Sequence, residues 1–534
     1  MKRRNFLQTT ATALTVAIAK PASSFTPPPA FELEELTIPE LQQGLQSGKY
    51  TSRSLVEKYS ERINDIDKRG PKLNSVIEFN PDSEAIAAAL DRERKERGPR
   101  GPLHGIPILI KDNIDTHDKM MTTAGSLALI GAKPFQDAFI VKKLRDAGAV
   151  ILGKTNLSEW ANFRSTKSSS GWSARGGQTR NPYALDRNPC GSSSGSGVAA
   201  SANLCAAAIG TETDGSIVCP SSANSLVGIK PTVGLVSRAG IIPIAHSQDT
   251  AGPMARTVTD AAIILGALVG EDPRDKQTAE SRGKSYTDYT RFLDKNGLKG
   301  MRIGVARNYM GFNQAVDDLM QQSKNAMGRL GATFIDPADI PTKGKFDDSE
   351  FEVLLYEFKA DLNAYLKSLG ATTPIRSLKE LIEFNESKAG LEMPYFGQDI
   401  FEKAQAKGPL TDPKYIQALR KNHRLTRTQG IDFIMKKHRL DAIVAPTGGP
   451  PWPTDWLNGD HFTGGYSSAS AVAGYPHITV PAGYVYGLPV GVSFFAGAYS
   501  EPTLIKIAYA FEQASKARRP PKFLPTVDFA PSDD

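Results

Sequence analysis

Short apolar runs that alternate with helical segments constrain the fold of this chain most strongly. The run GIPILI at 105–110 is bounded by turn residues, and 139–156 has the pattern of a helix, a glycine turn and a second apolar strand. The strand–helix–strand pattern recurs from MRIGVAR at 301–307, and further strands are predicted at 441–446 and 477–483. Continuous apolar runs are typical of strands buried on both faces. The alternation predicts an α/β fold with a large mixed, mostly parallel sheet covered by helices on both faces.

Length and composition fit one large globular domain. The chain has 534 residues, of which 40% are hydrophobic and 23% charged, so it can bury a sizeable core. We interpret residues 26–534 as a single domain. The stretch at about 275–440 is more charged and mostly helical. We interpret it as a helical insertion that caps the edge of the sheet.

The first 25 residues have the pattern of an export signal. Arg3 and Arg4 precede Phe6 and Leu7, a mildly apolar stretch follows at 10–19, and small residues come next. Paired arginines in this position resemble the twin-arginine signal that carries folded proteins out of the cytosol. We therefore predict a signal at 1–25 and a periplasmic location. No later run is long enough to form a membrane-spanning helix.

Charges, cysteines and histidines exclude several classes of function. The net charge is +7, but Lys and Arg are interspersed with Asp and Glu, and no basic stripe or nucleic-acid-binding module is present. Three cysteines leave at least one thiol without an intrachain partner, and they form no C-x-x-C pair. The seven histidines show no metal-binding spacing. We predict neither a nucleic-acid partner nor a metal.

A region rich in serine and glycine, at 165–222, concentrates the candidate chemistry. CGSSSGSG at 190–197 leads directly into a small, apolar helix-like segment, so it is no flexible tether between domains. Such a turn before a helix can bind an anion or an oxyanion through its backbone N–H groups. GSSSG also fits G-x-S-x-G with Ser193 as nucleophile, but that elbow needs a strand before it, and polar residues stand there instead. SRGK, which begins at Ser281, fits S-x-x-K without the motifs that accompany it.

A buried lysine is the candidate general base. Lys111 ends the apolar run GIPILIK, and Lys154 ends VILGK in the same local context. Burial disfavours the ammonium form, so such a lysine can be neutral near pH 7 and accept a proton from a serine. Either one could instead be a strand-end lysine whose charged head reaches solvent. The pattern does not choose between them, nor does it exclude a Ser-His-Asp triad with distant members.

These motifs together resemble the amidase signature family. The match covers roughly 30–525 and is densest at 104–256. It includes GIPILIKDNID, GAVILGKTNLSEWANF, CGSSSGSG, GTETDGSIVCPSS and SQDTAGPMARTVTDAA, in the family's order. One such motif is weak evidence, but the ordered series is specific. TETDGSIV and SQDTAGPMAR are most similar to the peptide amidase branch.

The resemblance implies a Ser–Ser–Lys triad and no cofactor or metal. The family's lysine falls on Lys111, its bridging serine, held by a cis peptide bond, on Ser192, and its nucleophile on Ser216. Lys111 then takes a proton from Ser192, which takes one from Ser216, and an acyl-enzyme forms and is hydrolysed. The oxyanion hole falls on the backbone of Thr213, Asp214, Gly215 and Ser216.

The chain departs from the family pattern near the implied nucleophile. Asp214 stands where glycine is usual, Val218 where arginine is usual, and Ser194 replaces a glycine. Asp214 and Val218 lie close to the implied nucleophile, where they would affect the choice of substrate, and Asp214 could orient or repel a charged substrate end.

We expect an exported serine hydrolase that cleaves carboxamide C–N bonds and releases ammonia, with C-terminal peptide amides as substrates. The alternatives are a fatty or aryl amide hydrolase, the glutamine-hydrolysing subunit of a tRNA amidotransferase, and a non-catalytic binding protein.

Overall fold

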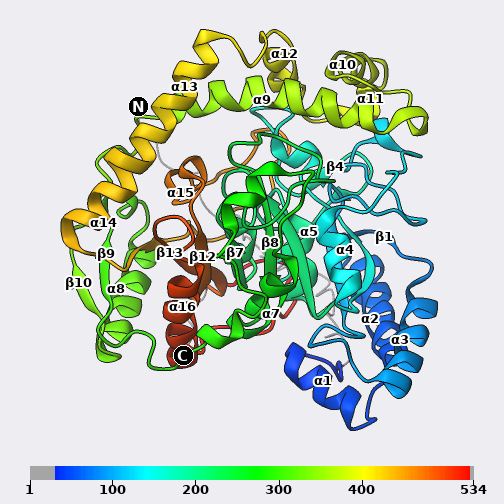
Figure 1. Ribbon diagram of the computed structural model, residues 1–534, viewed down its shortest axis with the longest axis horizontal. Coiled ribbons are helices and arrows are strands. Elements are labelled where there is room, and N and C mark those ends of the chain that lie inside the picture. Colours follow the sequence, from blue (N-terminus) through cyan, green and yellow to red (C-terminus); the bar gives the residue numbers. More distant parts are fainter. Residues whose placement is uncertain (1–29, 530–534) are drawn as a thin grey trace, which may run out of the picture.

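An eleven-stranded sheet forms the centre of the molecule in the computed structural model, which describes residues 30–529 (Figure 1). Its strands are β1 (Val76–Phe79), β2 (Pro107–Lys111), β3 (Val150–Thr155), β6 (Ala207–Glu212), β7 (Val227–Lys230), β8 (Thr250–Ala255), β9 (Arg302–Val305), β10 (Thr333–Ile335), β11 (Ala442–Pro446), β12 (His477–Val485) and β13 (Leu488–Phe495). They lie in the order β1-β3-β2-β6-β8-β7-β12-β13-β11-β9-β10. A separate ribbon contains β4 (Trp172–Ser173) and β5 (Gly177–Gln178). The predicted α/β class is confirmed. The predicted signal at 1–25 lies outside the described residues.

The sheet is mixed, as predicted, but the expectation that it is mostly parallel is wrong. Of the ten neighbouring strand pairs within residues 30–529, four are parallel and six antiparallel. The parallel pairs form two groups, β3-β2-β6 and β11-β9-β10, on either side of an antiparallel centre. The central strands are buried too, so their apolar runs look like those of parallel strands. β12 and β13 form a hairpin through Tyr486 and Gly487, whose φ angles of 50° and 75° are typical of hairpin turns.

Sixteen α-helices surround the sheet in the described part of the chain. They are α1 (Ile38–Gln46), α2 (Ser52–Arg62), α3 (Ser83–Arg97), α4 (Phe139–Asp146), α5 (Ser194–Ser201), α6 (Val218–Ala223), α7 (Val258–Leu268), α8 (Gln314–Arg329), α9 (Asp347–Ser368), α10 (Leu378–Ser387), α11 (Ala389–Glu392), α12 (Asp399–Gln405), α13 (Pro413–His423), α14 (Asp432–His438), α15 (Ser468–Ala473) and α16 (Glu501–Ser515). Several begin at a side-chain cap. The Thr37 hydroxyl accepts the N–H of Glu40 at the start of α1, and the Asp412 carboxylate accepts that of Lys414 at the start of α13.

A helical cap, residues 347–438 with helices α9 to α14, arches over one side of the sheet (Figure 1). α9 runs across the top of this view, and α13 descends on the left. Apolar side chains of α9 such as Leu354 and Phe358 share a buried cluster with Trp160 and Phe163 from the body of the protein. Within the predicted insertion at about 275–440, β9 and β10 are strands of the main sheet and α8 is the helix between them, so the helical cap occupies only the later part of that range.

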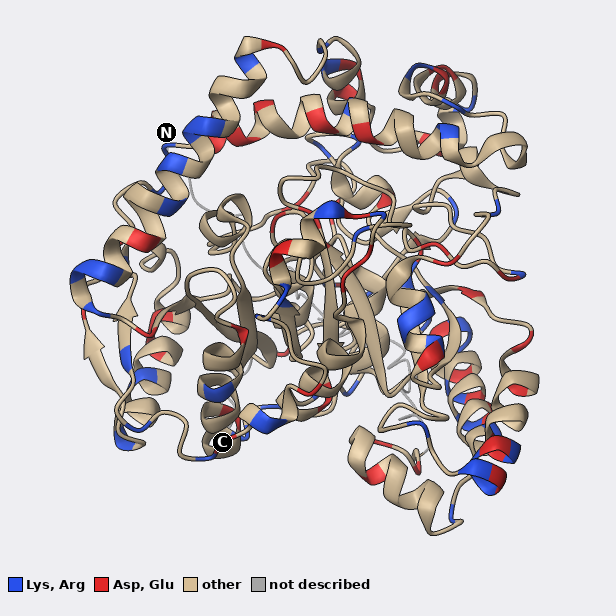
Figure 2. Cartoon of the chain, in the orientation of Figure 1, with Lys and Arg blue, Asp and Glu red and all other residues tan. Residues whose placement is uncertain are grey.

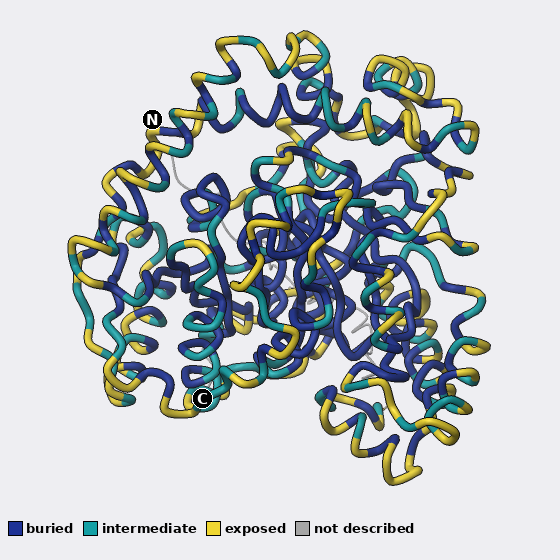
Figure 3. The backbone as a smooth tube through the Cα atoms, in the orientation of Figure 1, coloured by how far each residue is buried: buried dark blue, intermediate teal, exposed yellow. Residues whose placement is uncertain are grey.

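Buried residues are concentrated in the strands at the centre of the molecule, whereas charged residues lie mainly on the outer helices. The strands β2, β3 and β6 are buried along their whole length (Figure 3). Charged residues of both signs are interspersed on the outer helices (Figure 2), in agreement with the mixed charge pattern of the sequence. In residues 30–529, no helix combines the length and the apolar character needed to cross a membrane.

Candidate active site

Lys111 is the last residue of β2, and its side chain is completely buried. Its Nζ lies 2.7 Å from Ser192 Oγ and 2.9 Å from Thr211 Oγ1. Burial lowers the pKa of Lys111 to about 7, against the opposing effect of the carboxylates of Asp249 and Glu212. A lysine in this state is neutral in a large fraction of molecules near neutral pH, so it can accept a proton from the hydroxyl beside it.

Ser192 lies in the loop that leads into α5, and it is fully buried. The Gly191–Ser192 peptide bond is cis, as the family resemblance implies. The Ser192 carbonyl accepts the N–H of Ser158 at 3.0 Å, which ties the loop to the segment after β3. At Gly195, an added Cβ would lie 2.3 Å from the Ser75 carbonyl oxygen, so only glycine fits this part of the motif.

The other serines of the motif bind the backbone. Ser193 Oγ donates to the Thr211 carbonyl at 3.0 Å and lies 3.1 Å from the Thr211 N–H, which donates to it. Ser194 Oγ donates to the Cys190 carbonyl at 2.6 Å, and Ser196 Oγ to that of Ile209 at 3.0 Å. No strand precedes the motif, so the context that a nucleophile elbow at Ser193 requires is absent from this described segment.

Ser216 lies in the Ser216 loop, residues 213–217, which connects β6 to α6. Its side chain is 8% exposed, and its carbonyl accepts the N–H of Ser193 at 3.2 Å. This backbone bond places the two serine-bearing loops next to each other. Gly215 has a φ of 79°, a left-handed conformation that favours glycine at the turn.

Backbone N–H groups of the Ser216 loop are free to bind an oxyanion. Among the hydrogen bonds of residues 30–529, none uses the N–H of Asp214, Gly215 or Ser216. The next two amides are occupied, since the N–H groups of Ile217 and Val218 donate to Glu212 Oε2 at 2.7 and 3.0 Å. Donors are therefore available at three of the four residues where the resemblance places the oxyanion hole.

Lys154, the alternative base, has a different environment. It is fully buried, but its Nζ donates to the Ile114 carbonyl at 2.6 Å and to Thr122 Oγ1 at 2.9 Å. Several carboxylates around it oppose the effect of burial, which lowers its pKa. Neither of these partners is a serine of the motif, so the geometry favours Lys111.

Sequence reasoning missed Thr211 and the disulfide. The Thr211 hydroxyl, which contacts Lys111, also accepts a hydrogen bond from Asn113 Nδ2 at 3.0 Å. Nothing in the sequence distinguishes this threonine from others at strand ends. Cys190 and Cys219 form a disulfide with a Cα–Cα distance of 6.0 Å, which links the loop of Ser192 to α6 just after Ser216. Cys205 is free and buried, so one thiol is left unpaired, as the odd count predicts.

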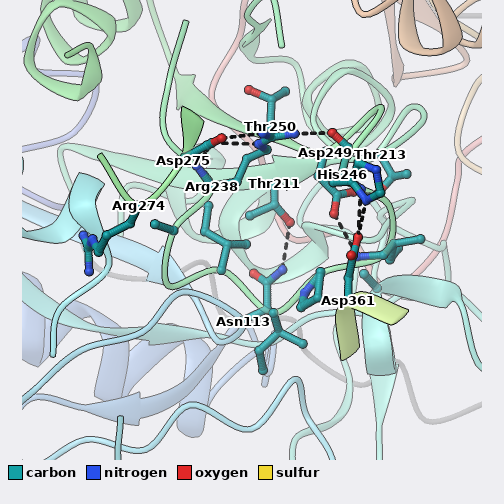
Figure 4. Close-up of a pocket in the computed structure, with 16 residues that line it drawn as sticks. Asn113, Thr211, Thr213, Arg238, His246, Asp249, Thr250, Arg274, Asp275 and Asp361 are labelled. Atoms are coloured by element: carbon teal, nitrogen blue, oxygen red, sulfur yellow. Dashed lines mark hydrogen bonds and ion pairs between the residues drawn. The ribbon is translucent and has the colours of Figure 1, made fainter. Parts of the chain in front are cut away.

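A cavity of about 200 Å³ lies beside Thr211 and the Ser216 loop (Figure 4). Thr211 and Thr213 line it together with Asn113, and the hydrogen bond between Asn113 and Thr211 is drawn in the figure. Thr213 Oγ1 donates to Asp249 Oδ1 at 2.5 Å. The cavity therefore extends to within one side chain of Lys111 and borders the Ser216 loop.

Comparisons with known proteins agree with this geometry. The family model described as amidase matches residues 54–505. A probable amidase of Arabidopsis thaliana is 45% identical over 503 residues, which cover 92% of this chain and 93% of that protein. A crystal structure of the peptide amidase PAM with the competitive inhibitor chymostatin has a TM-score of 0.90 and 52% identity, and covers 92% of this chain and 100% of that one. Native peptide amidase from Stenotrophomonas maltophilia has a TM-score of 0.88 and 51% identity, with the same coverage.

The amidase family model matches most of the chain. The Arabidopsis protein has a far higher sequence identity to this chain than proteins that share only a fold. The chain belongs to the amidase family, and it is an amidase.

Proposed function

We propose that this amidase hydrolyses primary carboxamides at the C-terminus of peptides, with Ser216 as nucleophile, Ser192 as proton relay and Lys111 as base. The observation that carries the proposal is the contact between a fully buried lysine and a serine hydroxyl, 2.7 Å from Lys111 Nζ to Ser192 Oγ. The similarity to a peptide amidase over nearly the whole chain supports the peptide amide as substrate.

In the proposed first half-reaction, neutral Lys111 accepts the proton of Ser192, and Ser192 accepts that of Ser216. Ser216 Oγ attacks the amide carbon, and the free N–H groups of Asp214, Gly215 and Ser216 stabilise the negative oxygen of the tetrahedral intermediate. Ser192 then delivers its proton to the nitrogen, the C–N bond breaks, and ammonia leaves. Ser192 recovers a proton from the protonated Lys111.

In the second half-reaction, water attacks the acyl group on Ser216. The same relay removes a proton from the water and returns one to Ser216, so that the carboxylic acid is released and the enzyme is restored. The overall change is amide plus water to acid plus ammonia.

The test is ammonia release from a panel of peptide amides, fatty amides, aryl amides and glutamine, with wild type and Ser216→Ala. We expect peptide amides to have the highest kcat/KM, and Ser216→Ala to show neither ammonia release nor an acyl-enzyme by mass spectrometry. Ser221→Ala is the matched control, because Ser221 is also buried, on the adjacent helix α6. Turnover that survives in Ser216→Ala would refute the nucleophile, and a preference for fatty or aryl amides would refute the substrate class.

We also propose that the protein is exported to the periplasm. The paired arginines near the N-terminus support this, and so does the disulfide, since disulfides persist mainly in oxidising compartments. Replacing Arg3 and Arg4 by lysine should leave the protein in the cytoplasmic fraction. Unchanged recovery in the periplasm would contradict this signal.

A further inference from the structure

The Ser216 loop carries an acidic residue with an unusual environment. Asp214 precedes Ser216 by two residues, and its Oδ2 accepts a hydrogen bond from Ser468 Oγ at 2.6 Å. Its Oδ1 is buried and receives no N–H or hydroxyl hydrogen from any described residue. A buried carboxylate oxygen without a donor is costly, so the group that faces Asp214 needs to be identified.

That group is the carboxyl of Glu350, on the first turn of α9 in the helical cap. Glu350 is 8% exposed and interacts with Asp214 through a side-chain hydrogen bond. Gln248 Nε2 donates to Glu350 Oε1 at 2.9 Å and to the Thr213 carbonyl at 3.3 Å. The cap helix therefore reaches the Ser216 loop twice, directly at Asp214 and through Gln248 at Thr213.

Two buried carboxyl groups in contact cannot both be ionised at neutral pH, because the two negative charges would repel each other in a medium of low dielectric constant. One of them must hold a proton and donate it to the other. Burial raises the pKa of both carboxyl groups, and that of Glu350 lies well above its usual value because the neighbouring Asp214 carboxylate raises it further. The hydroxyl of Ser468, in contrast, donates to Asp214 and favours its ionised form. Glu350 is thus the donor and Asp214 the acceptor.

Four other charged or titratable groups lie near the pair, and they act on it only through electrostatic interactions. They are Lys230 at the end of β7, Glu212 at the end of β6, Asp347 on α9, and Tyr309. Lys230 is the one cation among them, and its Nζ donates to the carbonyls of Ser470 and Tyr475. The ammonium group of Lys230 is thus engaged by backbone carbonyls rather than by either carboxyl of the pair.

We propose that Glu350 is a positioning residue of the amidase reaction, which holds the Ser216 loop in its working geometry from the cap helix through one proton shared with Asp214. The inference rests on the proposed role of Ser216. If the pair breaks, the loop that supplies the nucleophile and the oxyanion donors loses its support on the cap side. Displacements of about 1 Å at such groups can lower the rate about a hundredfold. At high pH the shared proton is lost and the two carboxylates repel, so kcat should fall on the alkaline side.

The experiment compares kcat, KM and the pH profile of four variants. Glu350→Gln keeps a hydrogen-bond donor but does not titrate, so we expect a kcat within about threefold of wild type and a weaker alkaline decline. Glu350→Leu removes the donor, and we expect kcat to fall at least about tenfold at pH 7 with a smaller change in KM. Glu352→Gln is the matched control on the same helix, where Glu352 forms ion pairs with Lys407 and Lys414, and it should behave as wild type.

Asp214→Asn keeps an acceptor for the Glu350 proton. If Glu350→Leu does not fold, this variant tests the role of the carboxyl pair instead. We expect Asp214→Asn to lose the same part of the alkaline decline as Glu350→Gln. The inference is overturned if folded Glu350→Leu matches wild type in kcat, or if both amide variants keep the wild-type alkaline limb. Ser216→Ala separates this failure from that of the proposed function: activity in Ser216→Ala refutes the mechanism, whereas wild-type activity in Glu350→Leu alone refutes only the role of Glu350.

Discussion

Lys111 is the last residue of β2, Lys154 is the last but one of the adjacent parallel strand β3, and their local sequences and burial are alike. In the register of β2 and β3, Lys111 pairs with Thr155 and Ile110 with Lys154, so the two lysines are one step apart in the sheet. Both side chains are completely buried. Yet Lys111 contacts the hydroxyl of Ser192 in the loop before α5, whereas Lys154 binds a carbonyl and a threonine.

The two ammonium groups differ in the carboxylates that other segments of the chain place around them. Around Lys154 the largest opposing charges come from Asp112 and Asp115, which favour a charged lysine. Around Lys111 they come from Asp249 and Glu212. Burial outweighs these charges and lowers the pKa of both lysines, that of Lys111 to about 7. The proposed difference in role between the two lysines therefore rests on their partners, a serine hydroxyl beside Lys111 and a carbonyl and a threonine beside Lys154.

The largest effect that this comparison predicts is on turnover. Lys111→Met should lower kcat about 10²- to 10⁴-fold, the usual contribution of a general base. Lys154→Met removes two hydrogen bonds beside buried carboxylates, so it should lower the free energy of unfolding by a few kcal/mol while the folded enzyme keeps its kcat within a few fold. Steady-state kinetics and denaturant unfolding of both variants are the measurements. A comparable loss of kcat in the two variants would remove the distinction.

The second effect concerns the hydroxyl that gives Lys111 its role. Ser192→Ala should lower kcat by about 10² or more, since the proton relay is broken. Ser193→Ala removes two hydrogen bonds to Thr211 and should cost about 1–3 kcal/mol of stability with a smaller effect on kcat. Kinetics of the two alanine variants at equal folded fraction test this. If Ser193→Ala were the more damaging to kcat, the relay would have to pass through the other serine.

The sequence predicted the strands that carry the site better than the architecture of the sheet. β2 and β3 stand out as apolar runs, because burial on both faces leaves a direct signature in composition. The antiparallel centre was not predictable in this way, since pairing direction depends on which distant strand lies alongside. The same limit applies to Cys190 and Cys219, whose pairing depends on how two loops fold together.

The proposed site was predicted through a family resemblance, and the geometry explains why pattern reasoning alone was insufficient. Lys111 and Ser192 are 81 residues apart in the chain, so no local spacing relates them. Thr211 is an ordinary strand-end threonine until Lys111 is placed beside it. Glu350 is on the cap, in a helix whose sequence shows only an acidic first turn. Residues that act through packing between distant segments leave no local motif.

The third prediction is the pH dependence that Lys111 imposes. Below a pKa of about 7 the lysine is protonated and cannot accept a proton, so kcat/KM should fall about tenfold per pH unit on the acid side. The folded-state pKa lies below that of an unfolded lysine, so the unfolded chain binds this proton more strongly between about pH 7 and 10.5. The contribution of Lys111 to the free energy of unfolding should therefore rise with pH in that window, by up to about 1.4 kcal/mol per unit. Denaturant unfolding of wild type and Lys111→Met at several pH values isolates this term, and parallel curves would contradict it.

The smallest effect comes from the threonine beside each lysine, and it is the sharpest comparison. The Thr211 hydroxyl accepts from Lys111 Nζ at 2.9 Å, and that of Thr122 accepts from Lys154 Nζ at the same distance. An acceptor stabilises the ammonium form, so Thr211→Val should lower the pKa of Lys111 and move the acid limb of kcat/KM to lower pH. Its kcat should fall only a few fold, because Ser192 still faces the lysine. Thr122→Val removes a matching hydroxyl and should cost about 1–3 kcal/mol of stability with no shift of the limb. The two substitutions are isosteric and both sites are buried, so the comparison is matched. If the acid limb of kcat/KM moves equally in both variants, or in neither, Lys111 does not set the pH dependence of this enzyme.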